Sequence, residues 1–438
     1  MLLIYLPHFS ERCDYVFKLI FNQQLGIEYA VTNDINNIQN YSEEKINYSS
    51  AKISNELFIK SAPLFFEKEI KKQGIIIGQK DQTLVLFPNE EDDVGFDLFS
   101  SVFYLVSRYE EYLPFEPDKF GRFKATNSLA FQNNFLQIPI VDIWINIFKD
   151  QLEKKFPSLA IKSTTFNAIF TFDIDVAYRF KGRSFGRNLG SLTKDIFKLK
   201  TNNIKKRFRV FSKKEKDPWD VYEALEKKII KNNFPSIFFF LLADKSNYDR
   251  NLDPQNPIMK SLINKVKSFS DIGIHPSFYS SDEPGKILIE KERLVNLSGK
   301  QITKSRQHFL RFIFPSTYNE LLNAGIFEDY SMAYPETPGF RAGTSKPFYF
   351  YDIKNEKATS LKVFPVTCMD ATFIHYLQKS PEKSLVEILN LLKEIKKVNG
   401  TFIPIFHNDN LGEKGEAKKW KSVHDSLVIQ VRSYLKKA

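Results

Sequence analysis

The chain has 438 residues, a formal net charge of +11, 42% hydrophobic residues and 15% aromatic residues. This apolar content can bury a core and therefore excludes a disordered chain. Only two cysteines occur, Cys13 and Cys368, which excludes a disulfide scaffold and a four-cysteine zinc site. The N-terminal apolar run lacks a basic flank and a small-residue cleavage site, so no signal peptide is expected. No uncharged apolar run is long enough for a membrane helix, and a cytoplasmic location is the expectation.

Residues 1–157 are expected to form an N-terminal α+β domain. Apolar runs bounded by turn residues predict strands, and apolar residues at helical spacing predict helices. The predicted elements are strands at 74–78 and 83–87 and helices at 97–112 and 141–156. Pro157 marks the expected boundary with the rest of the chain.

From about residue 165, short apolar runs alternate with helical patterns. The predicted strands are 168–172, 236–242, 271–274, 301–303, 361–364 and 401–406. The predicted helices are 218–232, 257–269, 285–297, 317–324 and 384–398. This alternation predicts parallel βα units, arranged as an open α/β sheet or as a barrel. Pro404 indicates that the last strand is bent or lies at an edge.

The excess positive charge lies in one segment. Residues 179–216 hold 14 Lys and Arg and only two acids, Asp195 and Glu215, for a net charge of +12. The other 400 residues carry 49 basic and 50 acidic side chains. This basic insertion is either a solvated surface helix and loop or a site for an anionic lipid, a phosphate group or an anionic glycan. No zinc-finger, single-strand or helix-turn-helix signature accompanies it, so nucleic acid is not an expected partner.

Functional side chains in parallel α/β folds follow the C-terminal ends of strands. Asp173 and Asp175 follow the first such strand, and their spacing on an extended chain points both to the same side. One carboxylate could bind a metal while the other takes a proton from water, or the pair could form an Asx-type turn. His275 ends the strand at 271–274 and is followed by Pro276. It is either a metal ligand or a core histidine.

Three further candidates follow in the chain. Arg306 comes after the strand at 301–303 and could fix a carboxylate through a bidentate pair. His308, two residues later, is either another metal ligand or a packed side chain. Arg341 lies in a glycine-flanked turn at 339–344. This turn either reaches an oxyanion or substrate or is a structural loop.

Two later strands also end in polar residues, Asp370 and His407. Aspartates and histidines that gather at strand ends without cysteines predict a catalytic divalent metal, Zn²⁺ or a similar ion, with an open coordination position. Such an ion polarises a carbonyl and activates water.

In this order, the motifs of residues 165–410 resemble those of the polysaccharide deacetylase family, which is carbohydrate esterase family 4 with its NodB homology domain. The resemblance implies a distorted (β/α) barrel of the NodB type over residues 158–438. It also implies that Asp173 is the catalytic base and that Asp175 is a metal ligand. His275 resembles the first histidine ligand of the family's second motif.

The same resemblance assigns roles to later residues. Arg306 resembles the arginine that orients the catalytic aspartate. Asp370 resembles the aspartate that tunes the catalytic histidine, and His407 resembles that histidine, the general acid. The family's second histidine ligand falls at Tyr279 here. Either His308 supplies the third protein ligand, or metal binding is weak or lost.

The whole chain also resembles a bacterial subgroup of this family that carries an extra N-terminal domain. In that subgroup the N-terminal domain ends in an Arg-Tyr-Glu-Glu-Tyr motif, which is found here at 108–112. The subgroup also carries a Gly-Phe-Arg-Ala-Gly-Thr motif, which is found here at 339–344. In a mechanism of this kind, the metal and a nearby hydrogen-bond donor would stabilise the oxyanion, and Arg341 is the candidate donor.

The function that follows is that of a metal-dependent deacetylase. It would hydrolyse the N-acetyl group of an amino sugar in a surface polysaccharide or in its lipid-linked or nucleotide-linked precursor. Two alternatives stay open. One is a catalytically degenerate glycan-binding or assembly protein, which Tyr279 supports. The other is an O-deacetylase, since both reactions pass through the same tetrahedral intermediate.

The basic insertion begins just after Asp175, so we expect it at the mouth of the active site. There it would meet an anionic lipid, a phosphate group or an acidic glycan. The expected location is therefore cytoplasmic, with peripheral attachment to the inner face of the membrane as an alternative.

Overall fold

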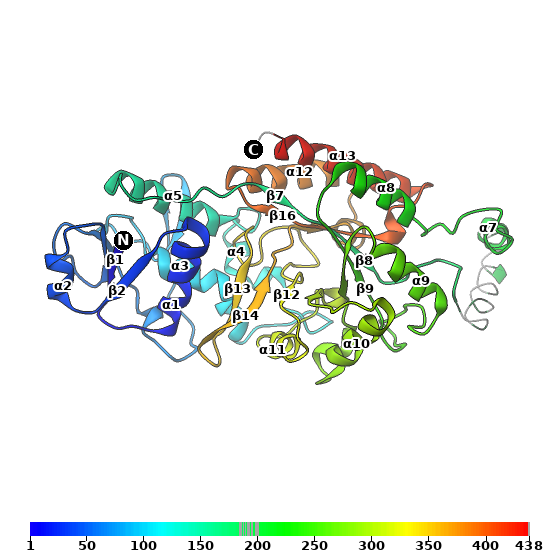
Figure 1. Cartoon of the computed structure of the whole chain (residues 1–438), viewed down its shortest axis with the longest axis horizontal. Helices are drawn as coiled ribbons and strands as arrows, with labels where there is room; N and C mark the ends of the chain where they lie inside the picture. Colours follow the sequence, from blue (N-terminus) through cyan, green and yellow to red (C-terminus); the bar gives the residue numbers. More distant parts are fainter. Residues whose placement is uncertain are drawn as a thin grey trace. The chain divides into compact units, whose positions relative to one another are not determined.

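The computed structural model describes residues 1–183, 186, 188, 190, 193, 196–197 and 201–436. Its backbone contacts divide the chain into two compact units (Figure 1). Unit 1 comprises Met1–Asn167, Gly339–Pro365 and Leu391–Thr401, and unit 2 comprises Ala168–Pro338, Val366–Asn390 and Phe402–Ala438. The domain boundary after residue 157 stays a prediction. Within the described ranges, no helix is long and apolar enough to cross a membrane.

Unit 1 contains a parallel sheet in the order β2-β1-β3-β4 and two antiparallel hairpins, β5–β6 and β13–β14. Its strands are β1 (Leu2–Tyr5), β2 (Tyr29–Thr32), β3 (Lys45–Ser49), β4 (Leu57–Lys60), β5 (Ile77–Lys80), β6 (Thr83–Leu86), β13 (Phe348–Asp352) and β14 (Lys357–Val363). Its α-helices are α1 (Glu11–Phe17), α2 (Ile35–Asn40), α3 (Leu98–Val106), α4 (Leu129–Gln132) and α5 (Ile140–Lys155). Its short or π-helical turns are η1 (Lys18–Leu25), η2 (Pro63–Phe65), η3 (Tyr109–Tyr112) and η4 (Ala125–Asn127).

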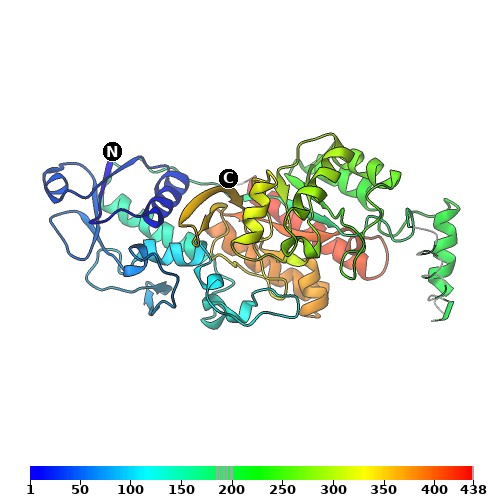
Figure 2. The same ribbon diagram turned by 90° about the horizontal axis from the view of Figure 1, so that it is seen from below.

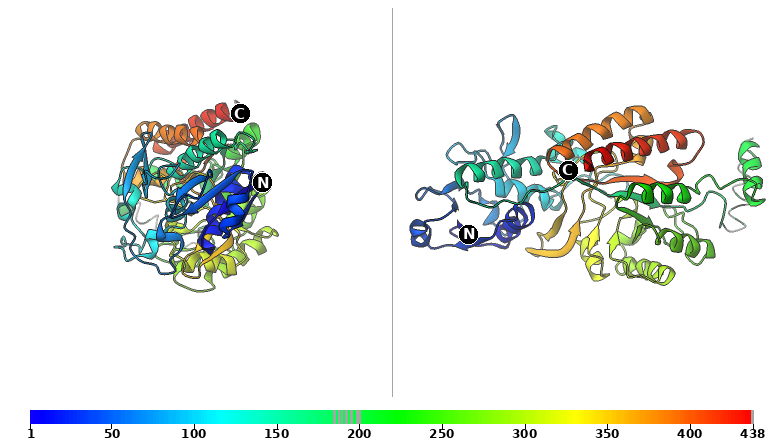
Figure 3. Two further views of the ribbon diagram at one scale, coloured as in Figure 1. Left: turned by 90° about the vertical axis from the view of Figure 1, so that its left-hand side faces the viewer. Right: turned by 45° about the horizontal axis from the view of Figure 1, so that its top comes forward.

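The core of unit 1 is rich in aromatic rings. Helix α1 packs against α3, and α3 packs against α5, as the blue to green-cyan helices of Figure 2 show. The sheet lies next to these helices and is seen in blue in the left view of Figure 3. Phe99 of α3 meets Phe17 edge-on with ring centroids 4.9 Å apart, and it meets Tyr48 at 5.1 Å. Edge-on aromatic pairs stabilise a core beyond their buried area.

The single helix predicted for 97–112 is wrong beyond Val106. Arg108 adopts the left-handed conformation with φ of 56°, and the chain continues as the 3₁₀ turn η3. The side chain of Arg108 is buried and donates to Glu110 and Glu111, at 2.8 Å each. A left-handed conformation is costly for a residue with a β-carbon, so we attribute the break to these two ion pairs.

Unit 2 is built on seven parallel strands in the order β12-β11-β10-β9-β8-β17-β15. The strands are β8 (Phe170–Ile174), β9 (Ser236–Phe240), β10 (Asp271–Ile274), β11 (Lys304–Ser305), β12 (Glu328–Asp329), β15 (Cys368–Met369) and β17 (Pro404–His407). The α/β class with parallel strands is therefore confirmed. In the described part of the chain this order does not return to its start, so the barrel is not confirmed.

Helices and turns connect these strands. The α-helices are α7 (Thr201–Phe211), α8 (Tyr222–Asn232), α9 (Pro257–Val266), α10 (Lys286–Ser298), α11 (Ser316–Asn323) and α13 (Glu416–Leu435). The short or π-helical turns are η5 (Phe278–Ser281), η6 (His308–Leu310), η7 (Thr372–Tyr376) and η8 (Asn408–Asn410). Helix α12 (Pro381–Lys397) begins in unit 2 and ends in unit 1, and β7 (Asn167–Ala168) and β16 (Thr401–Phe402) form a separate short sheet. Helices α9 and α10 pack against each other and against β10 (Figure 1).

Strands β8 and β9 are buried at every residue, which is typical of parallel strands covered on both faces. Phe172 of β8 stacks on Phe238 of β9 with centroids 4.6 Å apart. His424 of α13 packs against Phe172 and Phe406. Burial and the nearby charge of Lys228 hold its pKa well below the ordinary value, so this histidine is a neutral core residue.

The structure decides two sequence expectations for the sheet. The strand predicted at 361–364 is the end of β14, and its pairing with β13 is antiparallel instead of parallel. Pro404 begins β17, which pairs with β8 on one side and with β15 on the other, so it is not at an edge. The chain is instead interrupted at Ile403, between β16 and β17, which agrees with the bent alternative.

The register of the parallel strands aligns the strand ends that carry the candidate site residues. His407 of β17 lies opposite Asp173 of β8. Ile274, the last residue of β10, lies opposite Phe240 of β9 and Ser305 of β11. The residues that follow these strand ends therefore emerge side by side.

Glu111 lies at the centre of a buried ion network in unit 1. Glu111 accepts from Arg108 and, through both carboxylate oxygens, from Arg341 at 2.9 and 2.5 Å. We expect Glu111→Gln to destabilise the protein by about 3–5 kcal/mol, because it leaves two buried guanidinium groups poorly compensated. Urea denaturation followed by circular dichroism measures the difference.

The matched control is Glu153→Gln on α5. Glu153 pairs with Lys149 at 3.3 Å, and its side chain is 48% exposed. An exposed pair of this kind contributes about 0.3–0.5 kcal/mol. Equal losses in the two variants would show that the buried network does not stabilise unit 1.

Candidate active site

Every strand end that the sequence singled out in unit 2 contributes a side chain to one region. Asp173 lies within β8, and Asp175 is the first residue after this strand. His275 follows β10, and His308 begins η6 after β11. His407 is the last residue of β17. These positions, far apart in the sequence, are brought together by the parallel sheet.

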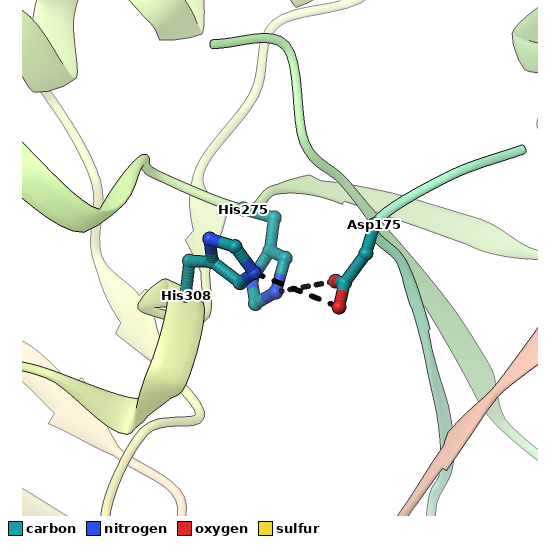
Figure 4. A group of neighbouring side chains, drawn as sticks. All are labelled: Asp175, His275 and His308. Carbon is teal, nitrogen blue, oxygen red and sulfur yellow. Dashed lines mark ion pairs between the residues drawn. The ribbon is translucent and has the colours of Figure 1, made fainter. Parts of the chain in front are cut away.

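Asp175, His275 and His308 form a candidate metal centre (Figure 4). One ligand atom from each lies within 4.8 Å of the others. His275 Nε2 is 3.2 Å from Asp175 Oδ1, and His308 Nε2 is 3.6 Å from Asp175 Oδ2. Ligand atoms about 2.0–2.1 Å from one tetrahedral zinc ion are about 3.3 Å from each other. The two separations therefore fit the ligand shell of such an ion.

Both histidines are oriented by a partner on the other ring nitrogen. His275 Nδ1 lies 2.5 Å from the carbonyl oxygen of Arg306, and His308 Nδ1 lies 2.8 Å from Asp249 Oδ1. A donor proton on Nδ1 leaves the lone pair on Nε2, where a metal would bind. Metal-binding histidines usually have this kind of second partner.

Asp249, which no sequence motif singled out, is part of the site. Its carboxylate is buried and also accepts from the backbone N–H of Phe278 and from the Ser246 hydroxyl, at 3.0 and 2.7 Å. Burial alone raises the pKa of Asp249, but these hydrogen bonds and the bond to His308 lower it below the ordinary value. Asp249 is therefore an ionised acceptor for His308. Its place in the loop after β9 was the only available signal.

Electrostatics at the cluster suit a cation. Burial raises the pKa of Asp175, but the charge of His308 and the close approach of both histidine rings outweigh burial, and the pKa lies well below the ordinary value. Burial lowers the pKa of His308, whereas Asp175 and Asp249 raise it, with a net value of about 9. Asp175 Oδ1 is a buried oxygen without a hydrogen bond of good geometry to any described residue. An ionised carboxylate with such an oxygen beside two imidazoles fits a divalent metal.

Asp173 is fixed next to this cluster. Arg306 Nη1 donates to Asp173 Oδ1 at 3.0 Å, and Arg306 Nε donates to the Tyr330 carbonyl at 2.9 Å. Both Asp173 and Arg306 are buried. The second oxygen, Asp173 Oδ2, lies 3.7 Å from His275 Nε2 and so faces the candidate metal centre.

His407 and Asp370 form a dyad on the other side of Asp175. His407 Nδ1 is 2.6 Å from Asp370 Oδ1, and His407 Nε2 lies 3.9 Å from Asp175 Oδ2. Asp370 Oδ2 also accepts from the His407 backbone N–H and from Asn410 Nδ2, at 2.8 and 2.9 Å. Burial lowers the pKa of His407, but Asp370 and the two other carboxylates raise it well above the ordinary value. His407 is thus held protonated, with Nε2 towards the cluster.

Tyr279, at the position where the sequence resemblance leads one to expect a histidine ligand, is absent from the candidate metal centre. It lies in η5 and contacts the rings of Phe278 and Tyr248 at 5.2 and 5.9 Å. His308, from η6, takes the third ligand position instead. The two positions belong to different connections of the sheet.

Aromatic rings border the cluster. Tyr248, next to Asp249, stacks on Phe278 at 3.9 Å and meets Phe309 edge-on at 5.8 Å. Phe309 lies 4.6 Å from the ring of His308, and it has a left-handed backbone with φ of 62°. Tyr248, Tyr279 and Phe309 are all half-buried, so part of each ring remains accessible.

Arg341 is placed in unit 1, where its Nε and Nη2 donate to Glu111. Its predicted role as an oxyanion donor stays a prediction, because its described hydrogen bonds do not go to the Asp175 cluster. The glycine-flanked turn around it has a structural use. Thr344 and Ser345 in the following residues donate to the buried carboxylate of Asp142.

The basic insertion is described only at 179–183, 186, 188, 190, 193, 196–197 and 201–216, and its remaining residues lie outside the described part. Its two ends are fixed beside the site. Asn408, which follows His407, donates to the carbonyls of Ala177 and Trp219. Asp217 accepts from the backbone N–H groups of Arg179 and Phe180. The residues that flank the insertion therefore lie beside His407, and the placement of the insertion itself at the mouth of the site stays a prediction.

Comparisons with known proteins give limited matches. A sequence-family model described as a family of unknown function, DUF7033, matches residues 2–157. No curated protein matches the chain. A candidate polysaccharide deacetylase from Mycobacterium smegmatis has a similar structure, with 14% identity over 61% of this chain and 85% of that chain and a TM-score of 0.41.

Two further solved structures are similar over a comparable share of the chain. For the polysaccharide deacetylase of Bacillus cereus, identity is 11% over 62% of this chain and 88% of that chain, with a TM-score of 0.31. A CE4 family pseudoenzyme from Bacillus anthracis has 7% identity over 61% of each chain and a TM-score of 0.31. Similarities of this size do not establish a shared activity, and the site geometry has to carry the functional assignment.

Metal content tests the candidate centre. We expect Asp175→Asn, His275→Ala and His308→Ala to lose bound Zn²⁺, because each removes one of three protein ligands. Asp249→Asn should weaken binding by about 10- to 100-fold, because it frees the ring of His308. Elemental analysis after zinc loading and desalting measures the stoichiometry. His375→Ala, at an exposed histidine, is the control. Full zinc retention in His308→Ala would contradict the assignment of the third ligand.

Proton release gives an independent test. The pKa of His308 is about 9 without metal, so this ring is protonated near neutral pH. A metal ligand must be neutral, so binding should release about one proton from His308, and affinity should rise as the pH increases towards 9. Calorimetry in buffers of different ionisation enthalpy counts the protons. His407→Ala keeps all three ligands and should keep this release. Zinc binding without proton release would contradict the role of His308.

Proposed function

We propose that this protein is a metal-dependent hydrolase that removes the N-acetyl group from an amino sugar of a polysaccharide or of its precursor. The observation that carries the proposal is the arrangement around Asp175. A three-residue candidate metal centre has a buried carboxylate, Asp173, on one side and a protonated histidine, His407, on the other. A base and an acid that flank a metal site are what hydrolysis of an acyl group requires.

The candidate base is Asp173. Arg306 occupies Oδ1, so Oδ2 is the oxygen left to take a proton from water. The paired guanidinium keeps Asp173 in one orientation, which lowers the entropy cost of reaching the reactive geometry. Arg306 is thus a positioning residue.

The candidate acid is His407. Asp370 holds Nδ1 and the backbone N–H of His407, and the ring points Nε2 towards the cluster. Its raised pKa means that Nε2 carries a proton at neutral pH, which it can donate to a departing amine. Asp370 stabilises the imidazolium and fixes the ring.

Asp175, His275 and His308 would hold the divalent metal, with Zn²⁺ as the expected ion. When bound, this ion supplies Lewis acidity, which polarises the acetyl carbonyl and makes water more acidic. The three side chains present one negative charge in total once both imidazoles are neutral. A dication would therefore keep a net positive charge at the position where an oxyanion develops.

A sugar ring fits the surroundings of the cluster. Tyr248 and Phe309 flank Asp249 and His308 in the sequence and present partly accessible rings beside the metal centre. The face of an aromatic ring is electron-rich, and the C–H faces of a pyranose carry partial positive charge, so the two stack favourably. This aromatic border supports a glycan as the substrate class.

Acetate release from an N-acetylated oligosaccharide tests the activity of the zinc-loaded protein. We expect Asp173→Asn and His407→Ala each to reduce kcat by about 10²- to 10⁴-fold, because each removes one proton-transfer group. Both variants should retain zinc, since neither changes a ligand. Chelation should abolish turnover, and His375→Ala should turn over normally.

The same assay separates the alternatives. Release from an O-acetylated glycan and not from the N-acetylated one would identify an O-deacetylase. Glycan binding without acetate release from either substrate would identify a degenerate binding protein, for which the substitution at Tyr279 is the supporting feature. Unchanged kcat in Asp173→Asn and His407→Ala would refute the proposed roles.

A further inference from the structure

One face of helix α7, in the basic insertion, packs against neighbouring residues of the chain. Arg207 is buried, lies 4.9 Å from the ring of Phe180, and donates to Asn188. Val210, one turn further along, is also buried. Asn203, on the same side, accepts from Arg179. Residues 203, 207 and 210 share one face of a helix, so this face is the attached one.

Another side of α7 is exposed and apolar. Phe208 is 61% exposed and Phe211 is 49% exposed, although such side chains are usually buried. Together with the half-buried Ile204 they recur at intervals of four and three residues, which forms a stripe along the helix. Ile196 and Phe197, earlier in the same insertion, are 52% and 88% exposed. Exposed apolar side chains therefore gather in this segment.

Basic residues adjoin the stripe. Lys205 and Arg209 are exposed and lie one turn apart, next to Phe208. Residues 201–214 contain six Lys and Arg and no acidic residue. Arg209 pairs with Glu215 only at 3.4 Å, and its side chain is 64% exposed. The positive charge of this surface is thus mostly uncompensated.

We propose that α7 docks on a lipid bilayer that contains anionic lipids. The stripe of Ile204, Phe208 and Phe211 would enter the boundary between headgroups and acyl chains, and Lys205 and Arg209 would contact lipid phosphates. A basic helix with an apolar stripe and low overall hydrophobicity binds the membrane interface in this way. This inference does not depend on the proposed hydrolase activity.

The exposed phenylalanines favour a bilayer over a nucleic-acid duplex. A duplex attracts lysine and arginine through its phosphates and leaves large apolar side chains in water. A bilayer removes these side chains from water as well, which adds the hydrophobic term to the electrostatic one. The presence of both kinds of side chain on one helix is therefore accounted for by a bilayer and not by a nucleic-acid duplex.

Vesicle flotation of the full chain tests the proposal. We expect binding to vesicles of phosphatidylcholine with about one-third phosphatidylglycerol, weak binding to pure phosphatidylcholine, and a decrease at high salt. Phe208→Ser/Phe211→Ser should weaken partitioning by about tenfold or more, because it removes the apolar stripe. Lys205→Glu/Arg209→Glu should have a similar effect through charge.

Matched controls use other surface helices. Ile230→Ser/Ile429→Ser removes two side chains that are 63% and 71% exposed, and Lys227→Glu/Lys231→Glu reverses two charges on α8. These controls should bind vesicles as the unmodified protein does. Thermal unfolding and zinc content should be the same for all variants, since none of these residues touches the core or the site.

Three outcomes would overturn the proposal. One is the absence of flotation with anionic vesicles. Another is equal flotation of the Phe208→Ser/Phe211→Ser variant and the unmodified protein. The third is tight binding to a DNA duplex that the lysine and arginine substitutions abolish and the phenylalanine substitutions leave unchanged. Acetate release from a soluble oligosaccharide is measured separately, so failure of either proposal is distinguishable from failure of the other.

Discussion

Parallel pairing of β17 with β8 is the constraint on which the candidate site depends. It places His407 opposite Asp173, and β9, β10 and β11 continue the same register towards His275 and Arg306. Parallel strands leave the sheet at a common edge, so residues separated by more than 200 positions emerge as neighbours. Packing between these strands depends on the register, since Phe172 of β8 stacks on Phe238 of β9, its partner across the pair.

Each reactive group at this edge is fixed by a partner that does not itself face the candidate metal. Asp249 orients His308, Arg306 orients Asp173, and Asp370 orients His407. Buried polar groups are costly unless they are paired, and here the pairing also selects one tautomer and one rotamer. The free nitrogen or oxygen of each group is thereby directed towards Asp175. Such preorganisation is the main means by which a protein stabilises developing charge.

Charge is used in two ways in this chain. Within unit 1, Arg108 and Arg341 are buried and matched by Glu110 and Glu111, so they contribute to structure and not to the external field. In the basic insertion, Lys205 and Arg209 of α7 are exposed, and the one acidic partner of Arg209 is Glu215 at 3.4 Å, so most of the charge of these two side chains acts on the surroundings. The net charge of +11 therefore reflects one surface segment whose ends meet at Asn408, beside His407.

The sequence by itself determined the α/β class, most helices of unit 2 and the strand ends that carry Asp173, Asp175, His275, His308 and His407. It could do so because local periodicity reports burial and because parallel strands place function at their carboxyl ends. Tertiary structure alone decided the rest. A contact between two loops places Asp249 against His308, and Arg341 pairs with Glu111 in unit 1. The helix predicted for 97–112 ends before Arg108, whose partners Glu110 and Glu111 are buried beside it. The contacts of Asp249 and Arg341 join residues that are distant in the sequence, so no local pattern predicts them. The end of the helix at Arg108 depends on buried ion pairs, which override the helical periodicity of the apolar residues.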